Sequence, residues 1–240
     1  MSASDDLRNM TPQESLVFFA TQVQRSSNGL AVAHASRNWQ LAALNYRQIF
    51  KCHLMRGLIS WRIHQNPKEH LCNAISVAAE GIRTLRSLSQ SLNAEESLPV
   101  AKAALLACLT GENFDTTDIV AETWACDSQL DLLLATSNPN DSKANVLIAS
   151  LREAKRTSLA AETYQNYFDI LASAGDSEKI EDLTNEGEVL FAKRARDSFF
   201  AGGDQTEGGG PDNNLVVDFR LAVALKRAGG HSSSLHAWAW

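Results

Sequence analysis

The chain carries the same helix-starting signal twice, and this signal limits what it can fold into. Thr11-Pro12-Gln13-Glu14 and Asn66-Pro67-Lys68-Glu69 each place a capping side chain before a proline and a glutamate two residues after it. Proline is tolerated at the first helical position, and the cap and the glutamate satisfy amide groups of the first turn that have no partner within the helix. We therefore expect helices to begin directly after both caps.

Hydrophobic periodicity predicts helices along nearly the whole chain. No segment alternates polar and apolar residues with β-branched enrichment, so we predict no sheet. We expect a bend near Gly57 and a break near Arg156. The expected helices cover residues 12–26, 30–65, 67–90, 100–109, 117–125, 128–136, 143–174, 177–201 and 214–228.

Two joints close a helix with glycine and then offer a polar cap to the next helix. They lie at Gly111 and Gly175, 64 residues apart, which is roughly two units of a tetratricopeptide-like period. Such joints are typical of antiparallel helical hairpins. We predict an all-α fold of these hairpins, arranged as a degenerate tetratricopeptide-like bundle or a short solenoid. One domain is expected over residues 1–240, with an alternative subdivision near 91–99.

Composition points to a cytoplasmic protein. Apolar residues make up 44% of the chain and charged residues 21%, as in ordinary globular proteins. The four cysteines form no CxxC pair, which favours free thiols in a reducing compartment. The first fourteen residues are acidic and polar, unlike a secretory signal, and no run of eighteen apolar residues predicts a membrane span.

Charge is distributed unevenly along the chain. Residues 25–90 contain nine Lys or Arg against two Asp or Glu, whereas residues 95–150 contain two against nine. The net charge of -6 disfavours nucleic-acid binding. An acidic surface steers basic proteins to an encounter. The residues predicted to contact such a partner are Glu112, Asp115, Asp118 and Glu122.

A glycine-rich acidic loop is expected at residues 202–213. Its oxygen donors lack the spacing of a calcium-binding EF-hand, and no Gly-Lys-Ser/Thr follows as in a phosphate-binding loop. We expect a flexible connector, with a partner-binding loop as the first alternative and a metal site as the second. No cofactor or metal is expected. As a second contact with a protein partner, the loop would use Asp204, Glu207 and Asp212.

One carboxylate is predicted in an apolar helix. Asp218 falls on the buried face of the helix expected over 214–228, where an unpaired charge would be very costly. We predict a structural pairing with Arg194 or Arg196, and a catalytic role is the alternative.

Histidines and terminal tryptophans complete the candidates. His53 and His64 share a predicted helix face but lack metal-ligand spacing, so buried structural roles are expected. Trp238 and Trp240 are expected to dock internally, or else to anchor a protein interface. No sequence motif for a reaction is present, so we do not expect an enzyme.

A family resemblance rests on the glycine-acid joints and on the run GGGPDNNLVVD at residues 208–218. Together with the antiparallel helices, these resemble the all-α immunity proteins that accompany bacterial polymorphic or secreted toxins. The resemblance implies a cytosolic antitoxin that binds and neutralises a cognate toxin. One alternative is a helical-repeat adaptor or chaperone that binds a peptide. Another is a helical-bundle enzyme with Asp218, Arg194 and His236 in its site. The oligomeric state is left open.

Overall fold

The computed structural model describes residues 10–88, 99–117, 119, 121–122, 124–137, 141–153, 158–200 and 218–229. Within these ranges every regular element is a helix and there is no strand, which confirms the all-α prediction. The described residues form two compact units, divided after Ala121, which we call the N-terminal and C-terminal units. The single-domain prediction and its alternative boundary near 91–99 stay predictions, because compactness does not test independent folding.

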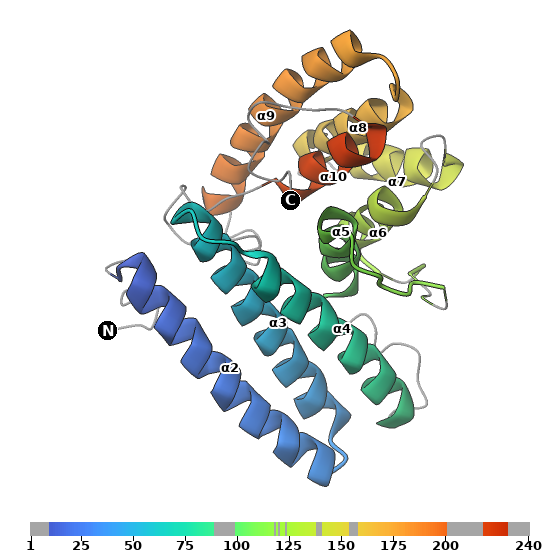
Figure 1. Cartoon of the computed structure of the whole chain (residues 1–240). Helices are drawn as coiled ribbons and strands as arrows, with labels where there is room; N and C mark the ends of the chain where they lie inside the picture. The colour runs from blue at the N-terminus through green and yellow to red at the C-terminus, as the bar shows by residue number, and fades with distance from the viewer. Residues whose placement is uncertain are drawn as a thin grey trace. The chain divides into compact units, whose positions relative to one another are not determined.

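The N-terminal unit is built from antiparallel helices. It contains α2 (Pro12–Ala35), α3 (Trp39–Arg62), α4 (Lys68–Leu88) and α5 (Val100–Thr110). Helix α3 lies between α2 and α4 and contacts both, and α5 packs against α4 (Figure 1). These three consecutive antiparallel helices match the predicted hairpins.

Both predicted helix starts are present. The Thr11 hydroxyl accepts a hydrogen bond from the Glu14 amide at 3.2 Å, and the Thr11 amide donates to the Glu14 carboxylate at 2.7 Å. Asn66 accepts from the amide of Lys68 at 2.9 Å, where α4 begins. Each cap involves residues no more than three positions apart, so its chemistry is local.

The predicted end of the first helix is wrong. Helix α2 continues past residue 26 to Ala35, because Gly29 serves a contact between helices and does not terminate one. A Cβ atom added to Gly29 would lie 2.5 Å from Oδ1 of Asn45 on α3, so a larger residue here would have to displace the Asn45 side chain. The single helix expected over 30–65 is also wrong. The chain turns between α2 and α3, where Arg37 has a φ of 52° and Asn38 caps α3 by accepting from the Leu41 amide at 3.0 Å.

A buried tyrosine joins the three long helices of the N-terminal unit. Tyr46 on α3 is 1% exposed. Its hydroxyl lies 3.2 Å from the Glu80 carboxylate and 3.1 Å from the Thr84 hydroxyl on α4, and 3.2 Å from Nε2 of His34 on α2. The buried polar group therefore meets partners from both neighbouring helices.

The C-terminal unit is organised around α8. It contains α6 (Cys126–Thr136), α7 (Ser142–Glu153), α8 (Ser158–Ala172), α9 (Ser177–Phe200) and α10 (Phe219–Ala228). Helix α8 contacts each of the other four, and it forms a hairpin with α9. Both glycines follow the end of a helix as predicted, since Gly111 ends α5 with a φ of 77° and Gly175 separates α8 from α9 with a φ of 93°. The next helix follows directly after the Gly175 joint but not after Gly111, where the described residues are not helical before α6.

Two expectations about the middle of the chain have different outcomes. The break near Arg156 is confirmed in that α7 and α8 are separate helices. The helix expected over 117–125 is wrong, because the described residues of that range are not helical. Just before it, Asp115 accepts hydrogen bonds from the amide of Thr117 at 2.9 Å and from its hydroxyl at 2.7 Å. A short polar side chain that bonds nearby backbone in this way competes with helix formation.

Candidate functional site

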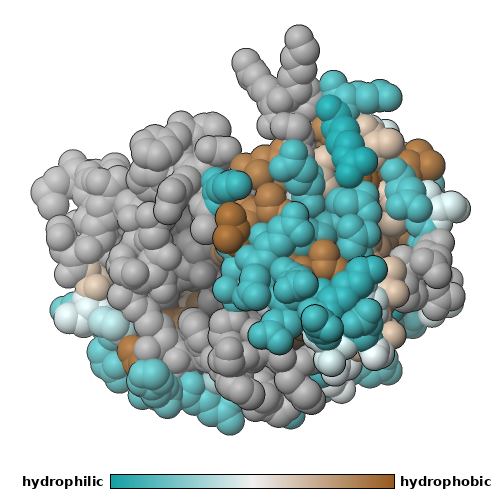
Figure 2. Space-filling model, turned by 90° about the horizontal axis from the view of Figure 1, so that it is seen from above, coloured by the Kyte–Doolittle hydropathy of each residue, from teal (hydrophilic) through white to brown (hydrophobic). Residues whose placement is uncertain are grey.

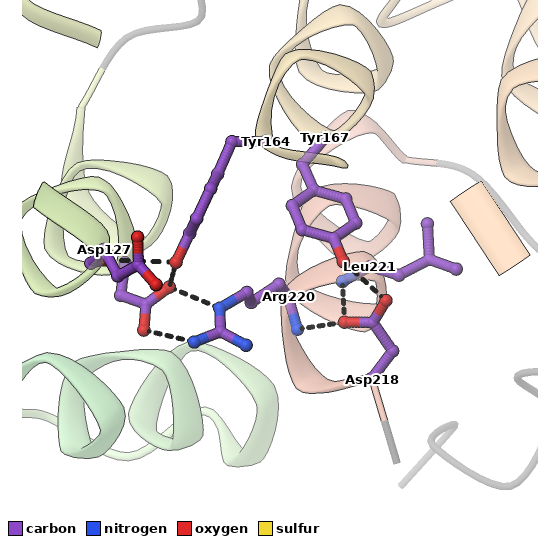
Figure 3. Close-up of polar contacts among 7 residues, drawn as sticks. Asp127, Tyr164, Tyr167, Asp218, Arg220 and Leu221 are labelled. Carbon is purple, nitrogen blue, oxygen red and sulfur yellow. Dashed lines mark hydrogen bonds and ion pairs between the residues drawn. The ribbon is translucent and has the colours of Figure 1, made fainter. Parts of the chain in front are cut away.

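A buried carboxylate begins α10, the last of the described helices in the C-terminal unit. One oxygen of Asp218 accepts from the amides of Arg220 and Leu221, both at 3.1 Å, and the other accepts from the Tyr167 hydroxyl at 2.7 Å (Figure 3). Asp218 is 8% exposed. The predicted helix start at residue 214 is therefore wrong, since α10 begins after Asp218. A carboxylate that accepts first-turn amides ends the preceding segment and begins the helix.

A buried ion pair lies next to this cap. Nε and Nη2 of Arg220 donate to the two carboxylate oxygens of Asp131 on α6, at 2.5 and 2.9 Å. The Arg220 and Asp131 side chains are only 8% and 4% exposed. Such two-pronged contacts between a guanidinium and a carboxylate fix both the distance and the orientation of the two groups.

Two tyrosines of α8 connect the cap to the ion pair. The Tyr164 hydroxyl lies 2.7 Å from Asp131 Oδ1 and 3.1 Å from the backbone carbonyl of Asp127. Its ring lies 5.6 Å from the Arg220 guanidinium carbon, and it meets the Tyr167 ring edge-on at 5.9 Å. Both tyrosines are fully buried. We call this group, formed by Asp131, Tyr164, Tyr167, Asp218 and Arg220, the buried polar network.

The buried polar network connects three helices. Its members come from α6, α8 and the N-cap and first turn of α10, and Asp131 and Asp218 each accept a hydrogen bond from a tyrosine of α8 (Figure 3). All five side chains are buried. Sequence reasoning found Asp218 but missed Asp131 and Arg220. The available signal was Arg220 itself, a cation within the apolar run of α10.

Several predicted site residues lie outside the described part of the chain. They fall at position 118, in the loop at 202–213 and in the C-terminal segment from 230 onward, and they include the side chains of two arginines on α9. The pairing of Asp218 with an α9 arginine therefore stays a prediction. The residues concerned are Asp118, Arg194, Arg196, Asp204, Glu207, Asp212, His236, Trp238 and Trp240.

The predicted acidic contacts divide between the two units. Glu112 and Asp115 are exposed in the non-helical segment that follows α5 in the N-terminal unit. The hydrogen bonds from the hydroxyl and amide of Thr117 lower the pKa of Asp115 below its ordinary value. Glu112 accepts a weak hydrogen bond from the Cys72 thiol at 3.5 Å. Both carboxylates are thus open to solvent, and Asp115 is held in its charged form.

Glu122 belongs to the C-terminal unit and has a cation of its own chain beside it. Lys143 Nζ lies 3.1 Å from its carboxylate, and both side chains are substantially exposed, at 44% for Lys143 and 64% for Glu122. A hydrogen bond from its own backbone amide, followed by Lys143, lowers the pKa of Glu122. Glu122 is therefore ionised but partly neutralised.

The remaining candidates are clusters of metal-ligating side chains and the cysteine thiols. Within the described ranges, no group of three or more His, Cys, Asp or Glu side chains is arranged to hold a metal ion. His64 lies beyond the end of α3 with a φ of 58°, so the predicted face shared with His53 is wrong. All four cysteines are free, and burial raises the pKa of Cys52 to about 11, which keeps its thiol neutral.

One face of the molecule can be described by its hydropathy. Figure 2 shows one face on which hydrophilic residues predominate among the coloured atoms, with hydrophobic residues in small areas between them. None of the described helices combines the length and the apolar character that crossing a bilayer requires. No protein-family model, curated protein or solved structure matches this chain.

Proposed function

We propose that this chain is a protein-binding module, and more specifically an immunity protein that binds and neutralises a cognate bacterial toxin. The observation that carries the proposal is the pair of exposed carboxylates at Glu112 and Asp115. They stand in a non-helical segment, so a basic partner can approach them without any helix moving. Asp118 and Glu122 are further contacts expected from the sequence.

Two further observations favour binding over catalysis. The carboxylate that an enzyme of this kind would use, Asp218, is committed to two backbone amides and to Tyr167. The neighbouring cation, Arg220, is committed to Asp131. Asp218 and Arg220 are thus occupied by contacts that hold helices together. The exposed carboxylates are more accessible to a binding partner.

Carboxylates suit a toxin that acts on nucleic acid. Such a toxin needs a cationic groove for phosphates, and a set of exposed carboxylates can occupy that groove in their place. The module would then act by covering the active site. The family resemblance and charge complementarity both support a partner with a cationic protein surface.

The test uses the product of a toxin-like gene adjacent to the gene for this chain. Co-expression should restore growth, and the two purified proteins should associate rapidly at low salt. The screening length falls from about 30 Å at 0.01 M salt to about 8 Å at 0.15 M. Because steering acts through exposed charges, the association rate constant should fall steeply over this range. A peptide adaptor would instead bind with little dependence on salt.

Charge reversal supplies the matched control. Glu112→Lys with Asp115→Lys should slow association and weaken protection, whereas Glu181→Lys with Asp182→Lys changes the net charge equally at exposed positions of α9. The α9 variant should retain most of the rate. A rate independent of salt, equal effects of the two double variants, or a toxic product that this chain does not neutralise would each contradict the proposal.

A further inference from the structure

A second polar cluster lies in the N-terminal unit, where α3 meets the first turn of α4. His53 and Arg56 are three positions apart on α3 and so share one side of the helix. Gly57 follows on the same side, and a Cβ added there would lie 3.7 Å from Cβ of His70 and 2.6 Å from Cδ2 of Leu71. The missing side chain of Gly57 thus lets the start of α4 approach the face that carries His53 and Arg56.

Three nitrogen atoms of this cluster are buried without a hydrogen-bond partner among the described residues. They are Nδ1 of His53, Nε of Arg56 and Nδ1 of His70. Buried polar atoms are nearly always hydrogen-bonded in folded proteins, so each exception needs an explanation. Three exceptions at one helix contact indicate a place where a ligand supplies the acceptors.

The charges at the cluster favour a negative ligand. Burial, and then the charge of Arg56, lower the pKa of both imidazoles, to about 4 for His53. Each imidazole is therefore neutral at pH 7. The carboxylate of Glu69 acts in the opposite direction on both histidines, but more weakly than Arg56. The cluster thus combines one cation with two neutral imidazoles, beside the carboxylate of Glu69.

We propose that His53, Arg56 and His70 form a binding site for a phosphate group, either free phosphate or a phosphate monoester. A guanidinium matches the oxygen geometry of phosphate, and four phosphate oxygens supply enough acceptors for all three side chains. Each of the three side chains is only partly buried, so an anion can approach from solvent. Contact with the ligand requires each imidazole to turn about χ2, a torsion with a broad energy profile.

The site shares no residue with the proposed toxin contact. Its residues belong to the α3–α4 hairpin, whereas Glu112, which accepts from Cys72 of α4, and Asp115 follow α5. Phosphate binding would therefore persist in the Glu112→Lys and Asp115→Lys double variant, and failure of one proposal leaves the other intact.

The experiment is a titration of the full chain with inorganic phosphate, followed by calorimetry and by the imidazole NMR signals. We expect the signals of His53 and His70 to shift saturably and the pKa of both to rise, because a bound dianion stabilises the imidazolium form. Arg56→Gln removes charge-assisted hydrogen bonds, so the affinity should fall about tenfold or more. Arg47→Gln removes an exposed arginine from the same helix and should leave the affinity within about twofold.

Comparison ligands identify the source of the phosphate group. Phenyl phosphate binding more tightly than inorganic phosphate would indicate a monoester ligand, and the reverse order would indicate free phosphate. Acetate and chloride at matched ionic strength should not reproduce the saturable shifts. The absence of saturation, the same shifts with acetate, or an equal loss in Arg47→Gln would overturn the proposal. If Arg56→Gln fails to fold by circular dichroism, His53→Gln with His70→Gln takes its place with the same expected loss.

Discussion

Removing the charge of Asp131 tests how the C-terminal unit is held together. Asn at this position keeps the shape of the side chain but removes the charge with which the buried Arg220 guanidinium pairs. The pair has two short N–H···O contacts and almost no solvent exposure, with side chains 8% and 4% exposed. Loss of one partner from such a pair costs about 3–5 kcal/mol. We expect Asp131→Asn to lower the free energy of unfolding by that amount.

Urea unfolding followed by circular dichroism measures this loss. With a denaturant dependence of about 1–3 kcal/mol per molar urea, the midpoint for the C-terminal unit should fall by about 1 M or more. Asp131→Leu combined with Arg220→Leu removes both charges, and replacing a whole buried pair by apolar residues is often nearly neutral. The double variant should therefore cost much less than the sum of its single variants.

An exposed ion pair in the same unit is the control. Glu122→Gln breaks the contact with Lys143, where solvent already screens both charges, so the midpoint should stay unchanged. The reasoning is refuted if Asp131→Asn moves the midpoint no further than Glu122→Gln does. It is also refuted if the cost of the double Leu variant equals the sum of the single costs, because burial of an unpaired charge would then not be the cause.

Three further predictions concern other parts of the chain. Gly29→Ala places a methyl group against Asn45 and should lower the free energy of unfolding, measured by thermal denaturation, by about 1–3 kcal/mol, although alanine favours helices. Adding Asn45→Ala to this variant should recover most of the lost stability. Burial and Arg56 lower the pKa of folded His53 from its ordinary 6.5 to about 4, so the unfolded state binds more protons between these pH values and stability should fall as the pH drops from 6.5 to 4. His53→Gln should flatten the pH dependence of the free energy of unfolding. An unchanged slope in this variant would contradict the prediction. Asp218→Ala removes the acceptor for two first-turn amides and should cost about 2–3 kcal/mol, seen as faster hydrogen exchange in α10; unchanged exchange would argue against the cap.

Much of the fold could be predicted because helix signals are local. The cap at Thr11 reaches only to Glu14, and the glycine joints at Gly111 and Gly175 adopt the left-handed backbone that ends a helix. Gly29 shows where this reasoning fails. The same residue type that ends α5 lies inside α2, because its role depends on Asn45 across the helix contact. Local sequence does not contain that neighbour.

The buried polar network also has a part that is predictable from local sequence and a part that is not. Asp218 could be singled out as a charge in an apolar segment, and its cap of α10 reaches only two and three residues along the chain. Its contact with Tyr167 and the pairing of Asp131 with Arg220 span 51 and 89 residues. Many other acids in the sequence were equally eligible partners for a buried arginine. Only the packing of α6, α8 and α10 selects one of them.

Local sequence is enough to predict that this protein is helical and where most of its helices begin and end. Those features depend on hydrogen bonds and apolar spacing within about one helical turn. The tertiary structure decided which helices touch, which glycines serve contacts, and which charges are buried together. Those features arise from packing between distant segments, where burial sets the cost of every unpaired charge and so determines the partners that each polar group must find.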